Sequence, residues 1–211
     1  ICRAVPAHIR VRLGSLEPRT ITPEFCRRAA ALPNLCPHFH LSMQSGCDSV
    51  LARMNRKYDS ERYYESVRLL NEAYETPGIT TDLIVGFPGE TEKDFEDTLD
   101  VVSKVFIRRC AFSAMHIFPY SRRPGTPADG MPAQILNSVK EERAHRAQQA
   151  ALEMEAAYLD RWVGRTVPVL FEEERDGLWR GHTTRYSEVA ATEFFNLHNQ
   201  LRQVYIIGRA G

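Results

Sequence analysis

The sequence lacks an apolar run long enough to cross a membrane, and its first residues lack the apolar core of a signal peptide. A membrane-spanning helix needs about 20 mostly apolar residues, and a secretory leader needs an apolar segment of about 7 to 15 residues. We therefore expect a cytoplasmic protein without a membrane partner. Neither sign of charge is in excess, because 27 basic residues balance 27 acidic ones, so the net charge favours no class of partner.

Cysteine is sparse, and its spacing argues against two kinds of protein. The five cysteines are odd in number, are widely spaced and include no CxxC pair, which makes a disulfide scaffold or a zinc ribbon an unsuitable interpretation. The positions are Cys2, Cys26, Cys36, Cys47 and Cys110.

Several catalytic motifs are also missing. There is no G-x-S-x-G, no H-E-x-x-H and no G-x-x-x-x-G-K, so hydrolases and nucleotide triphosphatases lose most of their support. His38 and His40 lie on one face of an expected strand without a third ligand at a fixed spacing. We predict that His40 is a packed or hydrogen-bonded strand residue and that the chain has no metal ligands of its own.

Three segments run from apolar residues into a turn marked by glycine or proline: 38–47, 79–90 and 112–126. Their apolar runs are too continuous for a half-exposed hairpin and favour parallel strands covered on both faces. A further strand is expected within residues 7–18. The pattern predicts an α/β fold, and 211 residues fall short of the roughly 250 of a complete eight-unit barrel, so the barrel would be partial.

Helix signals separate these strands. Thr22 is expected to cap a helix that starts at Pro23, Asp48 to cap a second one, and Thr91 with Asp94 to begin another. A helix within residues 60–74 is expected to bury Tyr64, Val67, Leu70 and Ala73.

The second half of the chain has a different pattern of apolar and polar residues. Residues 135–162 predict a long amphipathic helix that connects two domains. The short alternating runs after Gly164, broken by Asp176 and Gly177, predict an antiparallel hairpin meander. We therefore divide the chain into residues 1–134, the connecting helix 135–162 and a small β module, 163–211, whose last strand is expected to be missing.

Polar groups follow the expected strand ends. Gln44 and Ser45, with Arg56 one helix away, could hold a ribose, a carboxylate or a phosphate. The alternative is that Ser45 and Asp48 merely cap the helix, and this alternative is slightly favoured on sequence alone. Gly86 would let a flat ligand approach the backbone, although a tight turn explains the same glycine.

A basic stretch begins before the fourth strand and continues into the loop that follows it. No acidic residue occurs between Asp100 and Asp129, whereas aromatic side chains alternate with positive ones. Such a loop at the mouth of a barrel suits nucleic acid, and a solvated surface is the alternative. The residues are Lys104, Arg108, Arg109, Phe118, Tyr120, Arg122 and Arg123.

Four motifs in order, SLEP, HFHLSMQSGCDSVLARMNRKY, TTDLIVGFPGETEKDFEDTL and HIFPYSRRPGTPA, resemble those of the radical S-adenosylmethionine methylthiotransferases over residues 13–128. The wording is most similar to the branch that acts on threonylcarbamoyladenosine next to the anticodon of tRNA. The resemblance implies a truncated TIM-like barrel followed by a small β-barrel module similar to a TRAM domain, with tRNA as partner.

The resemblance also implies S-adenosylmethionine and two [4Fe-4S] clusters in a parent enzyme. The family holds these clusters with three cysteines of an N-terminal domain and a CxxxCxxC loop, and none of the cysteines here matches that loop. We therefore interpret the chain as a C-terminal fragment that lacks the cluster domain and is inactive alone.

By position in the motifs, eight residues are assigned to the cofactor and four arginines to RNA. The cofactor residues are Ser15, Glu17, Gln44, Ser45, Arg56, Asp82, Gly86 and Phe118, and the RNA residues are Arg122, Arg123, Arg180 and Arg185.

Two other accounts remain open. One is a cluster-free RNA-binding scaffold, and the other is an α/β barrel enzyme of different chemistry. Whichever account holds, an incomplete barrel would leave edge strands exposed, so we expect the fragment to self-associate.

Overall fold

A computed structural model describes residues 1–107 and 112–209 of the chain, with the side chains of 104–107 left out. Four parallel strands form the first sheet in the order β1-β2-β3-β4. They are β1 (Ser15–Leu16), β2 (His38–Leu41), β3 (Gly78–Val85) and β4 (Ala114–Pro119). The helices are η1 (Pro18–Thr20), α1 (Pro23–Ala30), α2 (Asp48–Arg53), α3 (Ser60–Ala73), α4 (Glu92–Ile107), η2 (Pro127–Gly130) and α5 (Asn137–Asp160).

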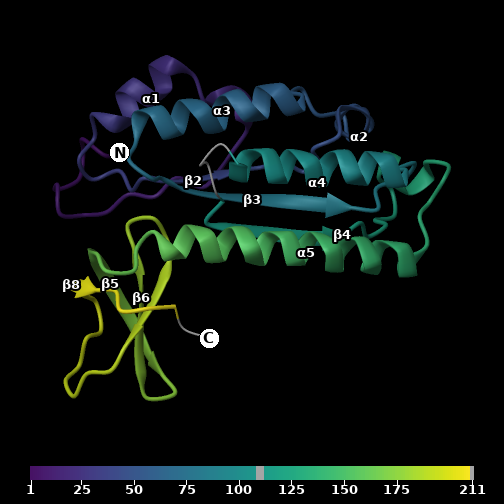
Figure 1. Cartoon of the computed structure of the whole chain (residues 1–211). Coiled ribbons are helices and arrows are strands. Elements are labelled where there is room, and N and C mark those ends of the chain that lie inside the picture. The colour runs from purple at the N-terminus through teal and green to yellow at the C-terminus, as the bar shows by residue number, and fades with distance from the viewer. Residues whose placement is uncertain (108–111, 210–211) are drawn as a thin grey trace.

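The sheet has the predicted α/β character. Consecutive strands are neighbours and parallel, and a helical segment follows each of the first three, as in a barrel fragment (Figure 1). The expected strand within residues 7–18 is much shorter than predicted: β1 has two residues, preceded by an isolated bridge between Val11 and Leu35. Gly14 and Pro18 bracket it, and neither residue favours a regular strand.

Local signals fix several helix starts. The Thr22 side chain accepts from the Phe25 amide, and Thr91 and Asp94 form a reciprocal capping box at the start of α4. Both confirm the predicted caps. Asp48 differs by one position, because it is the first residue of α2 and its carboxylate accepts from the Ser60 amide.

The core lies between the sheet and the helices α1, α3 and α4. Phe39, Leu41, Leu83 and Phe95 are fully buried there. In α3 the fully buried aromatic side chain is Tyr63, whereas Tyr64 and Ala73, expected inside, are only partly buried. Helical spacing identified the correct face of α3, but two of the predicted residues lie at the border of that face and not at its centre.

Strand β4 is not covered on both faces as the sequence predicted. Met115 is buried in the core, but His116 and Phe118 are exposed on the opposite face, and 51% of Phe118 is accessible. Among the described residues β4 is the edge strand of the open sheet, and no further strand pairs with it to close a barrel around that face. We call this surface, which carries His40, Asp82 and His116, the open face.

Helix α5 is part of the core rather than a simple connector. It runs alongside β4 (Figure 1) and buries Ala147, Ala151 and Met154 in the main hydrophobic cluster. Arg143 on the same helix forms a buried ion pair with Glu90, at 2.8 Å between Nη1 and Oε2. These contacts tie α5 to the turn between β3 and α4.

The second sheet contains β5 (Thr166–Arg175), β6 (Leu178–Thr183), β7 (Glu188–Ala191) and β8 (Gln200–Tyr205), all antiparallel, in the order β7-β6-β5-β8. Asp176 and Gly177 join β5 to β6 with positive φ angles of 55° and 75°, which confirms the predicted hairpin. The meander runs through β5, β6 and β7, after which β8 returns to pair with β5 instead of β7. We call residues 163–209 the β module.

The β module lies against the end of the parallel sheet where the strands begin (Figure 1). Arg185 of the module donates to the carbonyl oxygens of Thr76 (2.7 Å) and Glu75 (2.9 Å), just before β3. Arg10 donates in return to the Pro168 carbonyl oxygen at 3.3 Å. The carboxyl ends of the strands are thus at the far end of the sheet from the module.

Candidate binding site at the carboxyl edge of the parallel sheet

The register of the strands places three of the predicted site residues, Ser15, Asp82 and Phe118, on the open face. Ser15 is paired with His40, and Asp82 with His116. Ile84 pairs with Phe118 one row closer to the carboxyl edge. Because side chains alternate across a strand, these residues face away from the helix-covered core. Ligands of open parallel sheets bind at such carboxyl edges.

Gln44 sits where β2 ends, in a conformation that is unusual for its residue type. Its φ is 65°, and only 7% of the residue is exposed. Its amide donates to the Asp82 carbonyl oxygen, and its carbonyl accepts from the Ile84 amide, both at 2.9 Å. Two β3 contacts therefore hold Gln44 in a left-handed conformation, which is the kind of backbone strain that clusters at binding sites.

Ser45 and Gly46 serve the local structure. The Ser45 hydroxyl is buried, lies 3.2 Å from Thr98 Oγ1 and accepts from the Cys47 amide. A Cβ on Gly46 would lie 2.8 Å from the Thr98 Cα, so the glycine allows α4 to approach. The contacts of Ser45 point to α4 and to Cys47, and α2 begins without a side-chain cap hydrogen bond. Ser45 therefore does not cap that helix, and its ligand role stays a prediction.

Arg56 and Glu17 lie near the Tyr58 hydroxyl, which donates to the Ser42 carbonyl oxygen at 2.7 Å. Burial raises the pKa of Tyr58 to about 12, with Arg56 opposing the shift and Glu17 adding to it. Within the described residues, the buried Nε of Arg56 has no hydrogen-bond partner. An unpaired guanidinium nitrogen at a strand end fits an anionic ligand such as a carboxylate.

Gly86 does not offer its backbone to a flat ligand as predicted. Its φ is +72°, and a Cβ there would lie 2.4 Å from Cγ of Lys140, so the side chain of α5 fills that space. Its amide donates to Glu90 Oε2 at 2.6 Å. The glycine is explained by a tight turn that packs against α5.

The ring of His40 is hydrogen-bonded on both nitrogens, as expected for a strand residue. Nδ1 lies 3.0 Å from Thr80 Oγ1, and Nε2 lies 3.2 Å from Asp82 Oδ2. His40 therefore positions the Asp82 carboxylate, which is partly exposed on the open face. Thr80 was missed by the sequence analysis, although its alternation with Asp82 marks it as a residue of the same face.

The four arginines assigned to RNA are in different surroundings. Arg122 pairs with Asp129 at 2.8 Å, and Arg123 is exposed in the same loop. Arg180 pairs with Glu188 within the module. Arg185 is used for docking the module and stacks on Trp162 at 4.4 Å, so its guanidinium is already engaged. The side chains of Lys104, Arg108 and Arg109 lie outside the described residues.

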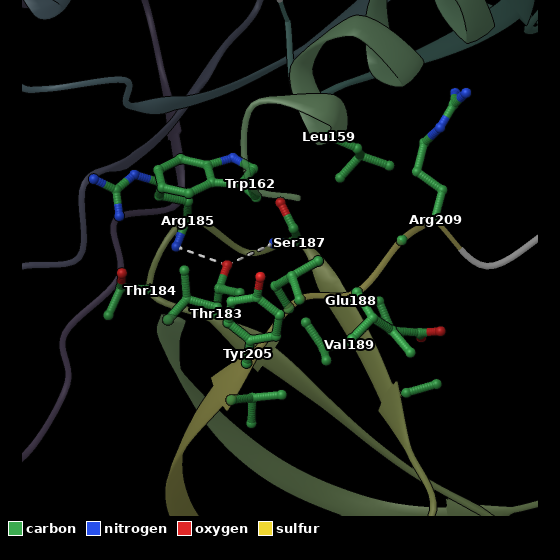
Figure 2. Close-up of a pocket in the computed structure, with 16 residues that line it drawn as sticks. Leu159, Trp162, Thr183, Thr184, Arg185, Ser187, Glu188, Val189, Tyr205 and Arg209 are labelled. Atoms are coloured by element: carbon green, nitrogen blue, oxygen red, sulfur yellow. Dashed lines mark hydrogen bonds between the residues drawn. The ribbon is translucent and has the colours of Figure 1, made fainter. Parts of the chain in front are cut away.

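A pocket of about 150 Å³ lies elsewhere, between the end of α5 and the β module (Figure 2). Leu159 and Trp162 form one wall, and Val189 and Tyr205 belong to the sheet below. Thr183 at the end of β6 accepts from the Ser187 amide beside it. This pocket belongs to the β module and is remote from the carboxyl edge.

Over residues 1–107 and 112–209, no group of three or more His, Cys, Asp or Glu side chains could hold a metal ion. The residues present therefore do not fit an iron-sulfur cluster. In the same ranges, no helix is both long and apolar enough to span a bilayer.

Both a protein-family profile and individual proteins of known function match the sequence. The profile of the Radical SAM superfamily matches residues 3–102. Over 172 residues the chain is 41% identical to the threonylcarbamoyladenosine tRNA methylthiotransferase MtaB of Thermotoga maritima, a match that covers 82% of this chain and 38% of that protein. It is 43% identical over 176 residues to the tRNA-2-methylthio-N(6)-dimethylallyladenosine synthase of Acidothermus cellulolyticus, covering 82% of this chain and 34% of the relative. The chain thus spans little more than a third of these relatives.

A solved structure supports the fold. Coproporphyrinogen III oxidase (HemN) from Escherichia coli, described as a radical SAM enzyme, superposes with a TM-score of 0.55 and 19% sequence identity, over 72% of this chain and 33% of that one. At this identity the match concerns the fold alone. By sequence, the chain matches the Radical SAM superfamily over residues 3–102 and is similar to tRNA methylthiotransferases over most of its length.

Proposed function

We propose that the chain is part of a cytoplasmic enzyme that methylthiolates an adenosine of tRNA, converting N6-threonylcarbamoyladenosine next to the anticodon into its 2-methylthio derivative. The observation that carries the proposal is the similarity of 82% of this chain to two tRNA methylthiotransferases, at 41% and 43% identity. The hydrogen bonds that join Gln44 to β3 beside Asp82 support it. The relatives named above act on two different modified adenosines at similar identity, so the choice of nucleoside rests on the motif wording.

The proposed cofactor is S-adenosylmethionine, which with reduced clusters would supply a radical able to abstract hydrogen from the adenine ring. The ligands of both [4Fe-4S] clusters would come from an N-terminal domain and a cysteine loop outside this chain. We therefore expect the 211 residues alone to be inactive.

The residues of this chain would bind and orient. Arg56, with its unpaired buried Nε, would take a carboxylate of the cofactor. Gln44 would offer its side-chain amide, from a backbone that two hydrogen bonds to β3 hold in place. Phe118, half exposed on the open face, would stack on a base or adenine ring. Ser15 and Glu17 would complete the rim at β1.

The tRNA contact would involve Arg122 and Arg123, in the loop that follows β4. The β module would be a TRAM-like RNA-binding domain, because it is a small antiparallel sheet with Arg180 on β6. With Arg185 engaged in docking, the RNA surface of the module would be its other faces. We propose residues 1–134 and 163–211 as two domains that α5 both connects and stabilises.

The proposal is tested by deleting the gene that encodes this chain and analysing the nucleosides of total tRNA by mass spectrometry. We expect loss of 2-methylthio-N6-threonylcarbamoyladenosine and accumulation of N6-threonylcarbamoyladenosine. Loss of the dimethylallyl counterpart would assign the other nucleoside, and an unchanged nucleoside profile would favour the cluster-free RNA-binding scaffold.

Complementation then tests the site. A gene copy with Arg56→Met should fail to restore the modification, because the carboxylate loses its partner. The matched control is Arg27→Met, which removes an exposed arginine paired only locally with Glu24 and should restore it fully.

A further inference from the structure

Four polar side chains on β2 and β3 form one continuous chain of hydrogen bonds on the open face. His38 Nε2 lies 3.2 Å from Thr80 Oγ1, and the same hydroxyl lies 3.0 Å from His40 Nδ1. His40 Nε2 then lies 3.2 Å from Asp82 Oδ2. The series runs from the start of the strands toward their carboxyl edge, and the alternation of strand side chains places all four on one face.

With Asp82 ionised and His40 neutral, the chemistry of these groups gives the series one direction. An ionised Asp82 can only accept, so His40 must carry its proton on Nε2. A neutral His40 then accepts at Nδ1, which makes Thr80 the donor to it. The same hydroxyl oxygen is left to accept from His38, which must therefore also carry its proton on Nε2.

The surroundings of His38 agree with this assignment. The residue is 2% exposed, and its Nδ1 is buried without a hydrogen-bond partner among the described residues. A buried lone pair is a lesser penalty than a buried unpaired N–H that lacks an acceptor. Burial, aided by the charge of Arg12, lowers the pKa of His38 to about 4, so the ring is neutral near pH 7.

Asp82 is where this series reaches solvent. Its side chain is 29% exposed, and its strand partner is His116 on the edge strand. One row further toward the carboxyl edge lie Ile84 and Phe118, an aliphatic and an aromatic surface. A carboxylate beside an aromatic ring at a strand end suits a heteroaromatic nucleoside that carries hydroxyl or amino donors.

We propose that His38, Thr80 and His40 are positioning residues that hold Asp82 as a fixed hydrogen-bond acceptor for an O–H or N–H donor of a bound adenosine group. This rests on the proposed function, in which both the cofactor and the tRNA substrate contain adenosine. The series removes the rotational freedom of the Asp82 carboxylate before the ligand arrives, which lowers the cost of binding.

The first test is the proton arrangement itself. Nitrogen NMR of the imidazoles of the 211-residue chain near pH 7 should show both His38 and His40 protonated on Nε2. Thr80→Ser keeps the hydroxyl and should preserve this pattern. Thr80→Val keeps the shape but removes the hydroxyl, so His38 should populate both tautomers. A proton on Nδ1 of either ring in the unsubstituted chain, or a Val variant identical to it, would overturn the series.

The second test concerns the ligand. We would titrate the chain with S-adenosylhomocysteine and, separately, with N6-threonylcarbamoyladenosine, because saturation by one or the other identifies the source of the adenosine. Asp82→Asn should weaken the bound probe on the order of tenfold, the worth of a charge-assisted hydrogen bond, and Thr80→Val should weaken it less. Thr80→Ser should restore affinity, and the control Asp97→Asn, an exposed partner of Lys93, should leave it unchanged.

The outcomes separate this inference from the proposed function. If the chain binds neither probe, or if Asp82→Asn binds as tightly as the unsubstituted chain, the acceptor role is wrong. The tRNA nucleoside analysis would still stand in that case, because it does not depend on Asp82.

Discussion

The burial of a single histidine makes the stability of this protein depend on pH. The pKa of His38 is lowered to about 4, chiefly by burial and further by Arg12 and His40, against about 6.5 in an unfolded chain. At a pH between these two pKa values, the His38 ring is protonated in the unfolded state and neutral in the folded state. The free energy of unfolding therefore falls as the pH drops. The loss should approach about 3 kcal/mol near pH 4.

Urea denaturation at several pH values between 7 and 4 measures this dependence. The comparison is with His38→Gln, which keeps a polar side chain but cannot titrate there, and the difference between the two proteins isolates His38 from other groups. We expect the stability advantage of the unsubstituted protein over His38→Gln to become smaller as the pH falls. Parallel curves would contradict the assignment.

At this same scale, sequence could identify residue types but not their partners. Gln44, Asp82 and Arg56 were proposed because polar groups follow apolar strands. The structure joins the Gln44 amide to the Asp82 carbonyl oxygen, and the binding role of the three residues stays a prediction. Arg185 gave no sign of its role, since its partners Glu75 and Thr76 are more than a hundred residues away. Gly86 was misread because the Lys140 side chain that packs against it comes from a distant helix.

At the scale of elements, one buried ion pair fixes α5 to the turn after β3. Arg143 and Glu90 are 5% and 1% exposed, and burial raises the pKa of Glu90 although the Gly86 amide and Arg143 oppose the shift. Arg143→Met would leave the carboxylate buried without its partner, which costs about 3 to 5 kcal/mol. The matched control is Arg146→Met, one turn away and paired at the surface, for which we expect less than about 1 kcal/mol.

The pH dependence of this variant gives the sharper measurement. Without Arg143 the folded-state pKa of Glu90 should rise further above its unfolded value, so the folded state takes up a proton first as the pH falls. Thermal or urea denaturation should therefore show a smaller defect near pH 4 than at pH 7. The double variant with Glu90→Gln should regain part of the loss, and a defect that is independent of pH would show that lost packing, not charge, is responsible.

Element boundaries were predictable where the signal is local. The Thr22 cap, the Thr91–Asp94 capping box and the Asp176–Gly177 hairpin each depend on a few neighbouring residues. The role of α5 and the return of β8 to β5 depend on contacts between distant segments, which a periodic pattern does not encode. The same limit explains why β4 was expected to be covered on both faces.

For the whole molecule, the open sheet still predicts self-association. β4 presents the exposed Phe118 at one edge, and the exposed Leu201 and Tyr205 lie on β8 at the edge of the second sheet. Unpaired edges with apolar side chains favour pairing between chains. Light scattering over a range of concentrations should show a rising mass, and Phe118→Lys should reduce it. A monodisperse monomer at all concentrations would refute the prediction.

The position of the β module sets how RNA could engage the whole molecule. The module docks where the strands begin, through Arg185 and through Arg12, whose guanidinium lies 3.5 Å from the centre of the Tyr186 ring. The carboxyl edge is at the other end of β3, whose eight residues span roughly 26 Å at about 3.3 Å per residue. An RNA bound by both must therefore extend along the sheet, and the docking geometry should matter for RNA but not for a small ligand.

Gly78 offers a way to disturb that docking alone. A Cβ on Gly78 would lie 2.3 Å from the Arg185 carbonyl oxygen, so Gly78→Ala must push the module away from the sheet. Hydrogen exchange should then increase near residues 75–78 and 182–187 while both sheets stay protected. Gly130→Ala, where a Cβ meets no atom within 4 Å, is the matched control. We expect Gly78→Ala to weaken tRNA binding and to leave binding of an adenosine probe unchanged, because the carboxyl edge is remote from the junction. Equal losses for both ligands would mean that the module and the edge form one site.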